Sequence, residues 1–238
     1  MNKKENPILS ILCNIFIPVM ILKKGELWFD GYNHYFNLDL QPFSFLVALL
    51  FPLIYFIYDL LNRKHINFIS ILGFVNVLLT GGIGIFGSRY GLTRSAFILK
   101  EGLMPILIGS FLFLYSKYKK SSFNSIILNQ ALFDTEKIKI YLIKNNNTDS
   151  LDSLTKKAGY YFIAGFFISS IIQFILASTI VTSNPGDSGF NEQVSTMTWV
   201  SYFAVLVPTI IIVGKGYFDL IVGIEKETGL KKEDFLKA

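Results

Sequence analysis

Residues 43–61 read FSFLVALLFPLIYFIYDLL, and residues 66–86 read INFISILGFVNVLLTGGIGIF. Each run is close to the roughly 20 apolar residues that an α-helix needs to cross about 30 Å of hydrocarbon. Only the short basic segment 62–65 separates the two runs. This pair predicts an all-α, polytopic membrane protein, because two long apolar helices joined so closely form a hairpin across a bilayer.

Four more apolar runs complete the pattern, at residues 7–22, 96–116, 158–181 and 198–224. The first run is short, but two lysines follow it and it lacks a small-residue cleavage site, so we interpret it as a retained span and not a signal peptide. Only 16% of the 238 residues are charged, compared with about a quarter in soluble domains. The sequence therefore predicts one membrane domain, residues 1–238, with six transmembrane helices.

Basic residues predict the orientation of these spans. With the N-terminus in the cytoplasm, sixteen Lys and Arg residues fall in cytoplasmic segments and four fall in outer loops, namely Lys23, Lys24, Arg89 and Arg94. The excess of positive charge marks the cytoplasmic side of membrane proteins. We therefore expect both termini in the cytoplasm.

The longest break between spans is a cytoplasmic insert at residues 117–157. Its first part, 123–144, mixes apolar and polar positions and predicts an amphipathic helix. That helix either lies on the bilayer surface or packs under the bundle.

Three prolines stand inside predicted spans. Each of Pro52, Pro105 and Pro208 has a leucine two residues before it. Proline lacks an N–H donor and crowds the carbonyl four residues earlier, so each is expected to kink its helix. All three spans run in the same direction in the predicted topology, which suggests three parallel helical hairpins.

Lys100 and Glu101 are adjacent charged residues inside the predicted span 96–116. Charge in a membrane is costly and marks a functional candidate. Adjacent helical residues point about 100° apart, so we expect the two side chains to occupy different faces. Either one faces a cavity while the other reaches the outer surface, or both anchor the helix at the interface.

Asn76, Thr80 and Gly84 are spaced four residues apart and share one face of their predicted helix. Small and polar residues on a face permit close helix packing. The same face could instead line a solute pathway, and the sequence leaves both interpretations open.

Asp59 and Arg63 follow Pro52 at the same distances as Lys215 and Asp219 follow Pro208, with the charges reversed. Each pair has the i, i+4 spacing of ion pairs within a helix. We also consider crosswise pairing, Asp59 with Lys215 and Arg63 with Asp219. Ordinary interfacial charge is the alternative.

No pattern in the chain indicates catalysis. Cys13 is the single cysteine, and His34 and His65 are far apart. We see no nucleophile–base pairing or metal-ligand cluster, so we expect no enzyme activity, no metal and no cofactor. The net charge of +5 is explained by topology, and no nucleic-acid partner is expected.

Residues 62–84, NRKHINFISILGFVNVLLTGGIG, followed by Phe97–Glu101 and Pro105, carry a family resemblance. This stretch resembles the bacterial VC0807-type membrane proteins, over residues 6–134, and more distantly the intracellular septation protein A family over the second to fourth spans. The resemblance implies a bacterial inner-membrane protein. This chain departs from the septation pattern in its longer cytoplasmic insert and in added outer-loop residues.

These observations predict a small-solute transporter-like protein. The alternative is a septation-protein-A-like scaffold for the cell envelope or division. The expected partners are the lipid bilayer, a second copy of the chain or envelope proteins, and an unidentified small solute if the protein is a transporter.

Overall fold

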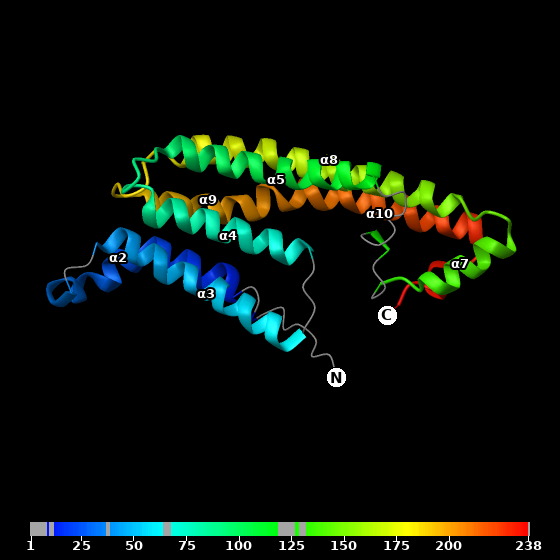
Figure 1. Cartoon of the computed structure of the whole chain (residues 1–238), viewed down its shortest axis with the longest axis horizontal. Coiled ribbons are helices and arrows are strands. Elements are labelled where there is room, and N and C mark those ends of the chain that lie inside the picture. The colour runs from blue at the N-terminus through cyan, green and yellow to red at the C-terminus, as the bar shows by residue number, and fades with distance from the viewer. Residues whose placement is uncertain are drawn as a thin grey trace. The chain divides into compact units, whose positions relative to one another are not determined.

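The computed structural model describes residues 9, 12–36, 39–63, 68–118, 127–128 and 132–237, and within them the chain is helical with no β-strand (Figure 1). A single isolated bridge pairs Phe133 with Leu236. The elements are η1 (Leu12–Phe16), α2 (Ile17–Phe36), α3 (Leu40–Arg63), α4 (Phe68–Phe86), α5 (Arg94–Tyr118), α7 (Thr135–Lys144), α8 (Ser150–Ile180), α9 (Phe190–Ala204), α10 (Leu206–Thr228) and α11 (Lys232–Phe235).

Four segments are long and apolar enough to cross a membrane, which is consistent with a membrane protein. They are Leu40–Tyr58, Arg94–Leu114, Ser150–Ile180 and Phe190–Thr228. The six predicted spans are therefore found only in part. The first falls on η1 and on α2, where Lys23, Lys24, Glu26 and Asp30 lower the hydropathy. The third is represented by the shorter apolar segment Val75–Phe86.

Two helices extend further than the sequence predicts. The first span was expected to end at Leu22, but α2 continues through the lysine pair to Phe36. Lys23, Lys24 and Glu26 end the apolar run of the sequence. They do not end the helix, because lysine and glutamate are good helix formers. Similarly, α8 begins at Ser150, eight residues before the predicted start of the fifth span.

Contacts along the chain define two compact units. Unit 1 comprises Met1–Met104 and Ile172–Ala204, and unit 2 comprises Pro105–Ile171 and Val205–Ala238. One division falls at Pro105 within α5, and another falls at Val205, which separates α9 from α10.

The core of unit 1 forms where α2, α3, α5 and α9 contribute large side chains. The Phe190 side chain is fully buried. Its ring meets Phe97 edge-on at 5.6 Å between centroids and lies over Phe45 at 6.3 Å. Ile21, Val194 and other aliphatic residues belong to the same cluster. The first residue of α9 is thereby anchored between α3 and α5.

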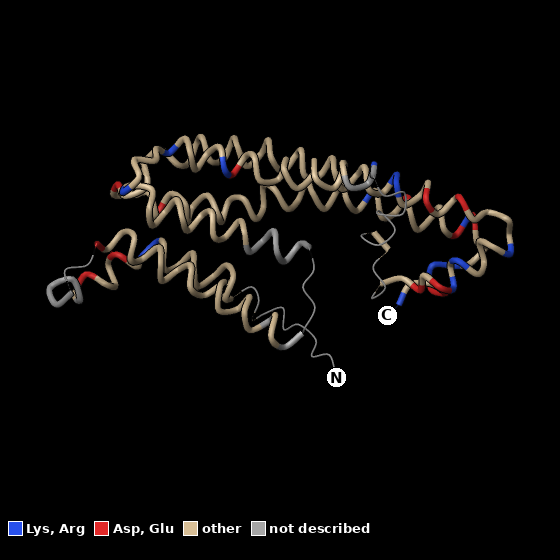
Figure 2. Tube along the Cα trace, viewed as in Figure 1, with Lys and Arg blue, Asp and Glu red and all other residues tan. Residues whose placement is uncertain are grey.

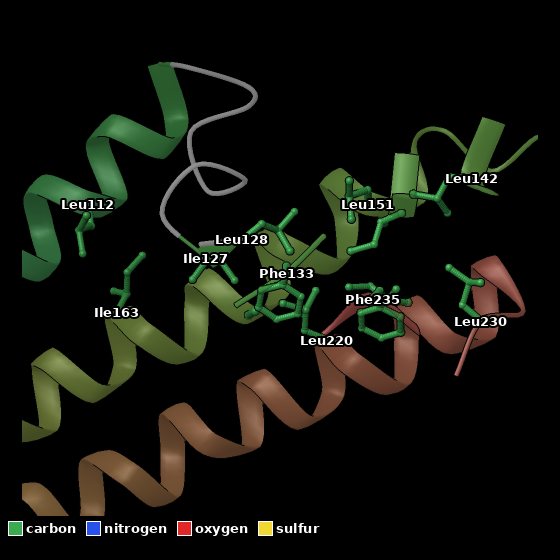
Figure 3. Packing of buried hydrophobic residues seen from close by; sticks show 13 residues of the cluster. Leu112, Ile127, Leu128, Phe133, Leu142, Leu151, Ile163, Leu220, Leu230 and Phe235 are labelled. Atoms are coloured by element: carbon green, nitrogen blue, oxygen red, sulfur yellow. The ribbon is translucent and has the colours of Figure 1, made fainter. Parts of the chain in front are cut away.

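The core of unit 2 joins the predicted insert, residues 117–157, to the end of the chain (Figure 3). The Phe133 and Phe235 rings stack with centroids 6.5 Å apart, and Leu220 lies beside them. Helix α7 contributes Ile138 and Leu142 to this cluster. The helix begins at Thr135, where the Asp134 side chain accepts a hydrogen bond from the Lys137 N–H at 3.1 Å. Residues 123–126 and 129–131 of the predicted helix lie outside the described residues, and within 132–144 the helix covers Thr135–Lys144 and packs one face on protein.

Glycines bring helices together within each unit. In unit 1, a Cβ added at Gly84 of α4 would lie 2.5 Å from the Phe45 ring of α3, and one at Gly81 would overlap Leu49. In unit 2, a Cβ at Gly216 of α10 would lie 2.7 Å from Tyr161 of α8. Such approaches leave no room for a methyl group, so these glycines set the helix separation.

Gly84 and Gly82 provide a matched test of this packing. Gly84→Ala places a methyl group against the buried Phe45 ring, whereas nothing lies within 4 Å of a Cβ at Gly82. We expect Gly84→Ala to destabilise the protein by about 1–3 kcal/mol through overpacking. Gly82→Ala should be neutral or stabilising by up to about 1 kcal/mol, because alanine favours helix. Unfolding of the purified protein in detergent measures both, and equal effects would contradict the assigned packing.

Candidate functional site

Lys100 and Glu101 form an ion pair in α5, within the apolar segment Arg94–Leu114. The Lys100 Nζ lies 2.6 Å from Glu101 Oε1, and the two side chains are 7% and 15% exposed. The two side chains leave the helix in different directions, but their charged ends meet. The flexible four-carbon stem of lysine lets its ammonium group reach back to the carboxylate. Charged residues are otherwise sparse along the middle of the long helices (Figure 2).

Thr80 of α4 completes the coordination of the Lys100 ammonium group. Lys100 Nζ donates to Thr80 Oγ1 at 2.5 Å, and the Thr80 hydroxyl donates to the Asn76 carbonyl oxygen at 2.9 Å. The ammonium group also lies 5.7 Å from the centroid of the Phe97 ring. A carboxylate, a hydroxyl and an aromatic face therefore surround one cation.

The predicted face of α4 divides between two neighbouring helices. Thr80 contacts Lys100 of α5, whereas Gly84 receives Phe45 of α3. Asn76 joins the hydrogen-bond chain through its backbone carbonyl. The structure thus brings Thr80, Lys100 and Glu101 together, and it places Gly84 in a packing contact.

The chemistry of this group is ionic and not nucleophilic. A buried ion pair pays a desolvation cost that its attraction often fails to recover, so such a pair is weak evidence of a purely stabilising role. Across the part of the chain that the structure describes, no group of three or more His, Cys, Asp and Glu residues could hold a metal ion. An anion from outside can replace Glu101 at the Lys100 ammonium group. A cation from outside can likewise replace Lys100 at the Glu101 carboxylate.

The three prolines occupy different local settings. Pro52 lies inside α3 and Pro105 inside α5. Since proline has no N–H, the carbonyl of Glu101 lacks its usual donor four residues later. Pro208 falls in the first turn of α10, after the interruption at Val205.

Lys215 and Asp219 form an ion pair within α10. Asp219 also lies 3.6 Å from the Lys157 Nζ, and it accepts a hydrogen bond from the Tyr161 hydroxyl at 3.4 Å, both from α8. The side chains of Asp59 and Arg63 lie outside the described residues. Crosswise pairing with Lys215 and Asp219 therefore stays a prediction.

The structure also contains a buried polar cluster that sequence analysis missed. In unit 1, the Gln41 amide of α3 donates to Asn191 Oδ1 of α9 at 2.9 Å, and Asn191 Nδ2 lies 3.2 Å from Glu26 Oε1 of α2. These residues are separated by up to 165 positions. Sequence spacing carries no sign of the contact, because Gln41 and Glu26 fall in a predicted loop.

Comparison with protein-family models, curated proteins and solved structures finds no match for the chain. The resemblance to VC0807-type and septation-like proteins therefore stays a prediction.

Removing one charge of the Lys100–Glu101 pair should cost more stability than removing both. Lys100→Met leaves the 15% exposed carboxylate without its cation, and the expected loss is about 3–5 kcal/mol. Lys100→Met combined with Glu101→Gln leaves no unpaired charge and should recover most of that loss. Denaturant titration in detergent compares the variants. A double variant as unstable as Lys100→Met would show that charge pairing is not the cause.

Proposed function

We propose that this chain is a bacterial inner-membrane protein that moves a small charged solute across the bilayer. The observation that carries the proposal is the partly buried group of Thr80, Lys100 and Glu101. Its ion pair lies in a helix that is long and apolar enough to cross a membrane. Ionisable residues in such segments mark ion or substrate pathways more often than structural positions.

The ion pair can act as a closed site that a solute opens. A carboxylate on the solute can replace Glu101 at the Lys100 ammonium group, and a cationic group can replace Lys100 at the Glu101 carboxylate. Thr80 then supplies a hydroxyl that remains with either partner. Pro105 lies four residues after Glu101 and frees the carbonyl there, which makes this turn of α5 easier to bend.

The proposal includes the full predicted topology of six spans with both termini in the cytoplasm. Helix α4 has 19 residues, and at 1.5 Å per residue it is about 28 Å long, close to the thickness of the hydrocarbon core. The remaining span is the predicted first one, residues 7–22, which includes η1 and the start of α2. The parallel repetition of three hairpins belongs to the same proposal.

The alternative function is a septation-protein-A-like cell-envelope or division scaffold that acts through protein partners. A scaffold in lipid needs a face for its partner, and small-residue faces serve that purpose. In α4, the positions of Gly81 and Gly84 are filled by Leu49 and Phe45 of the same chain. That observation favours transport over a scaffold that would use this face.

Uptake into proteoliposomes tests transport. The probes are classes of labelled solute, namely zwitterionic amino acids, monocarboxylates and alkylammonium ions, with an uncharged sugar as control. We expect one charged class to enter at least about tenfold faster with the wild type than with the Lys100→Met, Glu101→Gln double variant, because differences of a few kcal/mol in site binding have such effects. Equal uptake of every charged class by the two proteins would contradict the proposal.

Reporter fusions test the topology. Fusions after residue 64 and after residue 120 should report a cytoplasmic location, and fusions after residue 90 and after residue 187 an external one, because basic segments stay on the cytoplasmic side. An external location of residue 64 would remove the first span from the topology, while an external location of residue 120 would contradict the orientation of α5.

A further inference from the structure

The polar cluster of unit 1 lies where α2, α3 and α9 meet. It comprises Glu26 of α2, Gln41 and Ser44 of α3, and Asn191 of α9. Gln41, Ser44 and Asn191 are 6%, 0% and 1% exposed, so three polar side chains are removed from the surface. Gln41 and Ser44 are three residues apart, which places both on the face of α3 that meets the other two helices.

Hydrogen bonds determine which way each amide points. Asn191 Nδ2 donates to two acceptors, the backbone carbonyl oxygen of Gln41 at 2.9 Å and Glu26 Oε1 at 3.2 Å. This atom must therefore be the amide nitrogen. Asn191 Oδ1 then needs a donor, and it receives Gln41 Nε2 at 2.9 Å. The remaining amide atom of Gln41 is therefore its oxygen. Asn191 acts as a positioning residue that directs Gln41 Oε1 away from itself.

Two buried oxygens of the cluster have no hydrogen-bond partner. They are Gln41 Oε1 and Ser44 Oγ. A buried polar group without a partner costs about 1–3 kcal/mol, so native proteins nearly always satisfy it. Both of these atoms lie on one turn of α3, and each lacks the partner that a buried polar group needs.

Gly25 lets the α2 backbone pack closely against Ser44 of α3. A Cβ added at Gly25 would lie 3.0 Å from Ser44 Oγ, so any larger residue would press against the hydroxyl. Glu26 follows directly in the chain and brings a carboxylate to the same junction. No Lys or Arg that the structure describes forms an ion pair with that carboxylate.

We propose that Glu26, Gln41 and Ser44 bind a monovalent alkali cation, Na⁺ or K⁺, at this junction. The available groups are a carboxylate, an amide oxygen and a hydroxyl, all oxygen ligands of the kind that hard cations take. One carboxylate matches one positive charge, whereas divalent sites use several. A water molecule would satisfy Gln41 and Ser44 but would bring no positive charge to the partly exposed Glu26 carboxylate. The site does not depend on the transport proposal, because binding can be measured without uptake.

Thermal unfolding of the purified, detergent-solubilised full chain tests the site. The wild type is compared in NaCl, in KCl and in N-methyl-D-glucamine chloride at equal ionic strength. A ligand that binds only the folded state raises the Tm, and we expect a rise of about 3–6 °C once the cation exceeds its Kd about tenfold. At least one of Na⁺ and K⁺ should produce it, in a saturable manner.

Three variants separate cation binding from general stability. Ser44→Ala removes a ligand that has no protein partner, and Glu26→Gln removes the charge while keeping an oxygen for Asn191. Each should lose more than half of the cation-dependent rise. Ser195→Ala is the matched control, because Ser195 is equally buried but donates to the Val19 carbonyl oxygen at 3.1 Å. It should lower the Tm in every salt and keep the rise.

Two results would overturn the proposal. One is the same wild-type Tm in Na⁺, K⁺ and the organic cation, in which case the junction binds water only. The other is a full cation-dependent rise in both Ser44→Ala and Glu26→Gln, which would place the bound cation elsewhere.

Discussion

Close approach of helices at glycine is the constraint on which the packing of this chain depends. In lipid there is little hydrophobic gain from bringing two apolar helices together, so the contact has to be stabilised by van der Waals packing and by bonds between helices. A glycine opposite a large side chain provides the van der Waals packing. Gly84 opposite Phe45 is one instance and Gly216 opposite Tyr161 is another. Where such a contact forms, polar side chains nearby come within bonding distance.

The two polar groups of unit 1 follow from that geometry. Thr80 lies one turn from Gly84 in α4, and it is close enough to α5 for Lys100 to reach it. Gly25 lies beside Glu26 in α2, and the lack of a side chain there lets α2 pack closely against Ser44. The same type of contact therefore places a charge pair at one junction and a set of oxygen ligands at another. Both polar groups of unit 1 therefore lie near a glycine at a helix contact.

Sequence alone predicted much of the helical layout but little of the polar pairing. The apolar runs of α3, α5 and α8 were visible because hydropathy depends on composition over about 20 residues. Helix ends were missed where charged helix formers such as Lys23 and Lys24 extended α2. The contact between Lys100 and Glu101 was not predicted, because backbone direction was considered without side-chain length. Asn191 and Gln41 could not be paired, since their contact spans 150 residues and depends on three helices meeting.

The composition of the unit 2 core has a consequence for the order in which the protein can fold. Phe133, Ile138 and Leu142 pack against Leu220 and Phe235, which the ribosome makes roughly a hundred residues later. At about 5–20 residues per second, the insert waits some 5–20 seconds for the helices that cover it. During that interval its apolar side chains are exposed at the site of synthesis. A chaperone or the insertion machinery is thus expected to hold the insert until α10 and α11 emerge.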